Sequence, residues 1–124
     1  MFAVNGDMSI HVTRGDAVVF FVTADDDNGL RKFQVDDVIR VTVYGKKACE
    51  KVVLKKDFVV DEETDCVLLC LTGSETKIGE VISKPVDYWY DVKLNPDTNP
   101  QTLVGYDEGG AKVFRLFPEG NDVG

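Results

Sequence analysis

The residues best suited to chemistry are two aspartates on either side of a tryptophan. Asp87 and Asp91 are each two positions from Trp89. Because successive side chains of a strand point to opposite faces, all three would share one face of an extended segment. Glycoside hydrolysis uses a pair of carboxylates, and a neighbouring strand could supply the second one from Asp36 or Asp37. With one histidine and no activated serine pattern in the chain, a small hydrolase is the weakest of three functional hypotheses.

Three consecutive aromatic residues, Tyr88, Trp89 and Tyr90, offer a second kind of chemistry. Aromatic rings can stack on a sugar, so Trp89 with the neighbouring Tyr88 would form the platform of a carbohydrate-binding module. The competing interpretation is a core cluster with one interface residue, which is the commoner use of such residues. Solvent exposure of Trp89 separates the two, because a glycan platform must be open to water.

Two short motifs have structural explanations. Arg14-Gly15-Asp16 matches an adhesion tripeptide, but it falls between two strand patterns, where Gly-Asp favours a tight turn. Residues 25–28 are acidic, yet they lack the alternating ligands and the spaced glutamate of a calcium loop. A hairpin tip is predicted there, with a surface cation as the alternative. The only histidine, His11, is interpreted as an ordinary strand residue. No cofactor or metal is expected.

The three cysteines, Cys49, Cys66 and Cys70, are an odd number. Cys66 and Cys70 would share one strand face, but four extended residues hold them farther apart than the roughly 7 Å limit between the α-carbons of a disulfide. Buried free thiols in a reducing compartment are therefore predicted.

Length and charge exclude several classes of protein. The 124 residues suit one domain with its own core, and a net charge of −8 argues against binding to nucleic acid or to an anionic membrane. The longest apolar run, residues 17–22, is far short of the roughly 18 residues that a membrane-spanning helix needs. The first nine residues lack the basic and apolar regions of a signal peptide.

The elements that position these residues are short strands. Residues 85–106 predict a long hairpin, in which an alternating aromatic strand precedes a turn rich in asparagine and proline. That aromatic strand is the candidate central strand, with Tyr90 in the core. In all, about seven to nine short strands with frequent turn signals predict an all-β, antiparallel, immunoglobulin-like β-sandwich. It would form a single domain over residues 1–124, with loose termini at 1–7 and 119–124.

Two strands, at residues 17–23 and 66–72, are apolar on both faces. A two-sheet sandwich has only one interior, so each sheet should have a polar outer face. The surplus apolar residues must lie under loops, under a short helix such as one at residues 74–77, or against another subunit. If Val19, Phe21, Val67 and Leu69 point outward, they would form an interface and favour weak self-association. No binding to polysaccharide is expected on this hypothesis.

The order of these signals resembles a known family. The shared features are T-R-G-D before an apolar strand, a D-x-N-G turn, D-D-V-I-R-V-T-V, L-T-G-x-E-T at residues 71–76, Y-x-Y-D-V at residues 88–92, Gln101-Thr102, and a closing strand before Pro118-Glu119-Gly120. They span residues 8–120. They resemble the small β-sandwich domains of tailed-bacteriophage structural proteins, particularly the N-terminal domain of baseplate upper proteins, and short prophage proteins of Gram-positive gut bacteria.

The resemblance implies a non-enzymatic virion module of a baseplate or tail. Its partners would be other virion proteins, and it would reside in the bacterial cytoplasm during assembly and then in the phage particle. Baseplate upper proteins continue into a coiled coil and a further domain, whereas this chain ends at Gly124. A free-standing accessory or adapter protein, or an excised domain, is therefore expected. The family supplies no catalytic residues.

Overall fold

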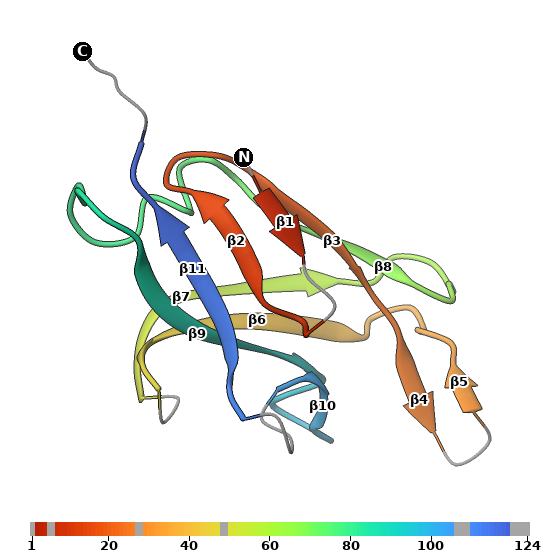
Figure 1. Ribbon diagram of the computed structural model, residues 1–124. Coiled ribbons are helices and arrows are strands. Elements are labelled where there is room, and N and C mark those ends of the chain that lie inside the picture. The colour runs from red at the N-terminus through yellow and green to blue at the C-terminus, as the bar shows by residue number, and fades with distance from the viewer. Residues whose placement is uncertain (1, 5–6, 27–28, 48–49, 106–109, 120–124) are drawn as a thin grey trace.

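A computed structural model of the chain describes residues 2–4, 7–26, 29–47, 50–105 and 110–119. Within these ranges it contains β-strands and no helix (Figure 1). The strands in chain order are β1 (Phe2–Val4), β2 (Ile10–Thr13), β3 (Val18–Val22), β4 (Ala24–Asp26), β5 (Gly29–Arg31), β6 (Val38–Lys46), β7 (Glu50–Val59), β8 (Val67–Leu71), β9 (Val86–Leu94), β10 (Gln101–Val104) and β11 (Lys112–Phe117).

Two layers of strands enclose the core, which confirms the predicted all-β, sandwich-like fold. The larger layer is a seven-stranded sheet in the order β1-β2-β11-β9-β6-β7, with β10 attached to β9. The smaller layer is the pair β3-β8, and a separate hairpin, β4-β5, extends from it. Figure 1 shows β6 and β7 running across the direction of β2 and β11, which reflects the strong twist expected of such a sheet.

Two details differ from the sequence-based expectation, whereas the number of strands agrees with it. The described residues form eleven strands, of which β1, β4 and β5 have only three residues each, and the other eight fall within the predicted seven to nine. Residues 2–4, expected to be loose, form β1 and pair with β2. One pairing is parallel, that of β2 with β11, so the sheet is mixed rather than wholly antiparallel.

Alternating side chains of both layers meet in the core. In β3 the first, third and fifth residues, Val18, Phe20 and Val22, are buried and those between them are exposed. The other large contributors come from facing strands of the seven-stranded sheet and from β8: Ile10, Val12, Ile39, Val41, Val43, Leu69, Leu71, Tyr90, Val92, Leu94, Phe114 and Leu116. Burial of these apolar groups is the main stabilising contribution to the fold.

Strand β9 is central, as predicted, because it pairs with β6, β10 and β11. Tyr90 on this strand is only 2% exposed. Its ring makes edge contacts with Phe20 and Phe114, and its hydroxyl donates a hydrogen bond to the carbonyl of Met8 at 2.5 Å. The predicted core position of Tyr90 is therefore confirmed, and its polar end has a partner.

The described cysteines carry free thiols. Cys70 is half-buried, but Cys66 is exposed, so the prediction that it is buried is wrong. Cys66 immediately precedes β8, where the chain is still in a surface turn. Cys49 lies outside the described residues.

Stability should not depend on oxidation. A disulfide stabilises mainly by restricting the unfolded chain, and neither Cys66 nor Cys70 is bridged. Thermal melts with and without a reducing agent are expected to give the same midpoint. A midpoint lowered by many degrees under reduction would contradict this prediction.

Candidate functional site

The outer face of the small sheet carries an exposed apolar patch. Phe21 is 67% exposed, Leu68 on the adjacent strand is 50% exposed, and Val19 is 36% exposed. Phe21 lies directly opposite Leu68 in the antiparallel register, and Val19 lies opposite Cys70. These four residues, called the β3–β8 patch below, are contiguous, unlike the scattered surface apolar residues found on most soluble proteins.

The structure shows that two of the four predicted interface residues do not belong to this patch. Val19 and Phe21 point outward as expected, but Leu69 is fully buried and Val67 is half-buried against the core. In β8 the outward residues are instead Leu68 and Cys70. Because both faces of this strand are apolar in sequence, the pattern alone did not reveal which residues face the interior.

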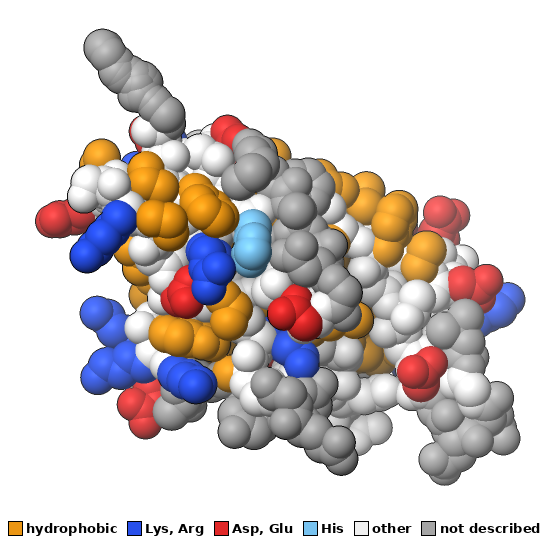
Figure 2. Space-filling view, viewed as in Figure 1, with side chains coloured by type: hydrophobic (Ala, Val, Ile, Leu, Met, Phe, Trp, Pro, Cys, Tyr) orange, Lys and Arg blue, Asp and Glu red, His pale blue; other side chains and the backbone are white. Residues whose placement is uncertain are grey.

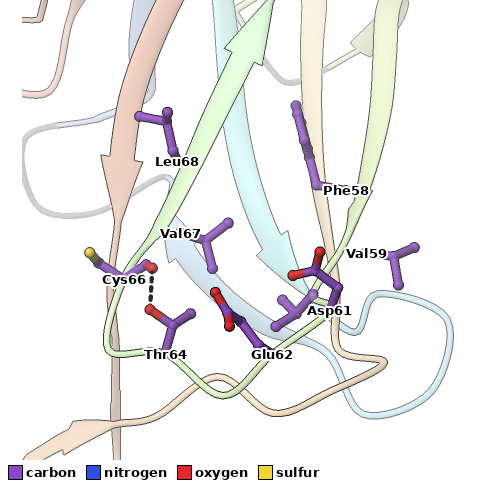
Figure 3. A pocket seen from close by; sticks show the side chains of 9 residues that line it. Phe58, Val59, Asp61, Glu62, Thr64, Cys66, Val67 and Leu68 are labelled. Carbon is purple, nitrogen blue, oxygen red and sulfur yellow. Dashed lines mark hydrogen bonds between the residues drawn. The ribbon is translucent and has the colours of Figure 1, made fainter.

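A groove opens between β7 and β8 beside this patch (Figure 3). It has a volume of about 320 Å³, and Leu68 lines it as well as belonging to the patch. Both strands are sheet edges here, with β7 ending the large sheet and β8 pairing only with β3. Apolar side chains line its walls, while Asp61 and Glu62 lie between the two strands in the connecting turn. The apolar surface therefore continues from the patch into a groove with an acidic border.

The outer face of the large sheet is different, because charged side chains lie among the hydrophobic ones around His11 (Figure 2). Trp89 is partly exposed on this face, directly opposite Tyr44 of β6. Tyr88 points to the inner face and packs against the core. The predicted platform of Trp89 with Tyr88 is therefore wrong, since adjacent residues of a strand point to opposite faces.

Asp91 lies on the same face and is largely enclosed, with 8% of its surface exposed. Its Oδ2 accepts a hydrogen bond from the Tyr44 hydroxyl at 2.9 Å. Its Oδ1 is buried and accepts no hydrogen bond from any part of the chain that the structure describes. Burial raises the pKa of this carboxyl, although the Tyr44 hydrogen bond and the charge of Lys93 act in the opposite direction.

The carboxylate pair of the hydrolase hypothesis does not form. Asp91 lies opposite Thr42 of β6, and Asp37, in the turn just before β6, is five positions from Thr42 in the chain. At about 3.3 Å per residue this separates the two aspartates by roughly 16 Å, whereas glycosidase pairs are roughly 5–9.5 Å apart. Asp87 is instead paired with Arg115, whose Nε donates to Oδ1 at 2.7 Å. This hydrogen bond lowers the pKa of Asp87.

Asp37 has a structural role. Its side chain accepts hydrogen bonds from the Gln34 amide at 2.8 Å, from Arg31 at 3.0 Å and from the Asn95 side chain at 3.1 Å. Burial alone would raise its pKa, but these hydrogen bonds outweigh burial and lower it. Asn95 in turn accepts from the amide of Val38, so the cluster joins the start of β6 to the end of β9.

The adhesion-like tripeptide is part of the fold, as predicted. Arg14 is buried, and its guanidinium donates to the carbonyl of Gly79 at 2.8 Å and to Glu119 at 2.9 Å. The buried Thr76 hydroxyl accepts from the Gly15 amide and donates to the carbonyl of Asp16. An adhesion receptor could not bind the Arg14 side chain while that side chain makes these hydrogen bonds.

The remaining sequence candidates are surface features. Two residues of the acidic segment 25–28, Asp27 and Asn28, lie outside the described residues. Within the described ranges, no three histidine, cysteine or acidic side chains gather as metal ligands would. His11 lies in β2 and contacts the edge of Phe117. The described part of the chain also has no helix that could cross a membrane.

Comparisons of the chain with family models, with curated proteins and with solved structures found no match.

Proposed function

We propose that this protein is a non-enzymatic module that acts through protein–protein contact, with the β3–β8 patch as its binding surface. The observation that carries the proposal is the pair Phe21 and Leu68, which lie side by side on adjacent strands and are both at least half exposed. Large contiguous apolar groups on an outer sheet face are unfavourable in water, and they mark interaction sites in soluble proteins.

The contrast between the two outer faces supports this proposal. On the large sheet, the outward positions of β6 and β9 are mainly polar, for example Arg40, Thr42 and Lys93. On the small sheet, the outward positions of β3 are valine and phenylalanine. A sandwich that functioned alone would carry polar residues on both outer faces.

The assembly that we propose is a phage or prophage particle, in which copies of the chain pack with one another and with other virion proteins. This step comes from the family resemblance of residues 8–120, with the apolar outer face as the structural feature that suits it. The genes beside the coding sequence test it directly. Portal, tape-measure or tail-fibre genes on either side would support a virion role, and their absence from a fully sequenced locus would count against it.

Self-association should depend on the β3–β8 patch. In sedimentation velocity, the wild-type sedimentation coefficient is expected to rise with protein concentration, and Phe21→Ser should reduce this rise. Phe21 is two-thirds exposed, so the change should alter monomer stability by no more than about 0.5 kcal/mol.

Val81→Ser is the matched control, because Val81 is also strongly exposed but lies in the loop between β8 and β9. It should associate as the wild type does. A wild-type protein that stays monomeric at high concentration, and whose Trp89 fluorescence is quenched by a polysaccharide, would instead favour a carbohydrate-binding module.

A further inference from the structure

A second pocket lies on the outer face of the large sheet, on a different layer from the β3–β8 patch. Its volume is about 330 Å³, within the range of small-molecule sites. Thr42 and Asp91, which are buried cross-strand neighbours on β6 and β9, belong to its lining. Pro96 and Pro100, from the turn after β9, add apolar surface.

One carboxylate oxygen of Asp91, a residue that lines this pocket, has no hydrogen-bond donor among the described residues. Its Oδ1 is buried without a partner among the described residues, while Oδ2 is held by the Tyr44 hydroxyl. A buried acceptor that lacks a hydrogen bond is unfavourable. The terminal torsion of an aspartate is broad. A rotation of this carboxyl that brings Oδ1 to a ligand would move Oδ2 as well, so the Tyr44 hydroxyl, which also lines the pocket, would move with it.

The cations of the pocket are not all engaged. Arg40 donates hydrogen bonds to Asp57 at 2.7 Å and 3.0 Å and to Asp97 at 3.1 Å and 3.0 Å, so two carboxylates neutralise it. Lys55 and Lys93 also line the pocket. Neither lysine forms an ion pair with a residue that the structure describes. Their charges act at longer range on Asp57, Asp97 and Asp91, but neither amine donates directly to a carboxylate of the described chain, so both can donate to an anionic ligand.

We propose that this pocket binds a small hydroxycarboxylate. The ligand hydroxyl would donate to Oδ1 of Asp91, and its carboxylate would lie against Lys55 and Lys93. Both groups are needed, because a simple anion leaves Oδ1 without a donor and a neutral alcohol offers no carboxylate to the two lysines. The apolar sides of the pocket, including the prolines, suit a short carbon chain between the two polar ends.

Three probes of similar size separate these contributions: malate, succinate, which lacks only the hydroxyl, and butane-1,2,4-triol, which lacks the carboxylates. Titration followed by ¹⁵N–¹H NMR should shift the amide signals of Tyr44, Asp91 and Lys93 with malate. Because a hydrogen bond to a charged group is among the stronger ones, succinate should bind about tenfold more weakly. The triol should cause no comparable shifts.

Single variants test the contribution of each side chain to binding. Asp91→Ala should remove the preference for malate over succinate, while Lys93→Gln should weaken the binding of both acids. Comparison with the wild-type spectrum shows whether each variant is folded. Lys84→Gln, on an exposed loop, is the matched control and should bind as the wild type does. Equal affinity for malate and succinate in the wild-type protein, shifts centred elsewhere, an equal loss in Lys84→Gln, or no binding of malate would each overturn the proposal.

Discussion

Replacing Tyr90 by alanine is expected to lower the free energy of unfolding by about 3–5 kcal/mol, the usual range for a large buried aromatic side chain. The ring lies in the centre of the sandwich, where it contacts Phe20 from the small sheet and Phe114 from the neighbouring strand. Its removal would leave a cavity between the two layers, because strands that pair on both sides cannot easily move to fill it. Denaturant unfolding monitored by circular dichroism measures the loss.

Tyr90→Phe is the matched control. It keeps the ring and removes only the hydroxyl that donates to the carbonyl of Met8, so a smaller loss of about 1 kcal/mol is expected. If Tyr90→Ala cost less than about 1 kcal/mol, the packing of this strand described above would be wrong.

Replacing Asp37 by alanine is expected to lower the free energy of unfolding by about 2–4 kcal/mol. Three donors converge on this carboxylate, and at least the backbone amide of Gln34 and the side chain of Asn95 would lose their acceptor. Donors deprived of a partner in a mostly buried site are more costly than the hydrogen bond itself. Asp61→Ala, at an exposed position, should change stability by less than about 0.5 kcal/mol. A loss of similar size in both variants would contradict a structural role for Asp37.

The pH dependence of stability gives a second measure of the same residue. The folded protein holds the pKa of Asp37 below its ordinary value of 3.8. The stabilisation from its ionised form is therefore complete above that value and is lost as the pH falls through the lower, folded-state pKa. As the pH is lowered below 3.8, wild-type stability should therefore fall more steeply than that of Asp37→Asn. Parallel curves for the two proteins would exclude this contribution.

The strict alternation of inward-facing apolar residues with other residues explains why part of the fold could be predicted from the sequence. In β9 every second residue is apolar or aromatic, and in β6 Ile39, Val41 and Val43 alternate with polar residues. Such a period of two specifies both the strand and its inward face. The same rule already placed Trp89 and Tyr88 on opposite faces, so the platform of these two residues could have been rejected without a structure.

The unpredicted features depend on contacts between distant segments. Strand β8 is apolar on both faces, so only its pairing with β3 determines that Leu69 is buried and Leu68 exposed. The pocket at Asp91 combines side chains of β6, β7 and β9 with prolines of a turn. The role of Tyr44 could not be predicted, because nothing in the local pattern shows that it lies across from Trp89 and donates a hydrogen bond to Asp91.

The parallel pairing of β2 with β11 has a consequence for folding kinetics. It joins segments about one hundred positions apart, and Ile10 and Val12 of β2 are buried beside it. Closing so long a loop is entropically unfavourable before the contacts form, and chains dominated by distant pairings fold in milliseconds to seconds rather than microseconds. During synthesis β2 must wait for β11 to leave the ribosome, so its apolar side chains remain accessible to chaperones until nearly the whole domain has been translated.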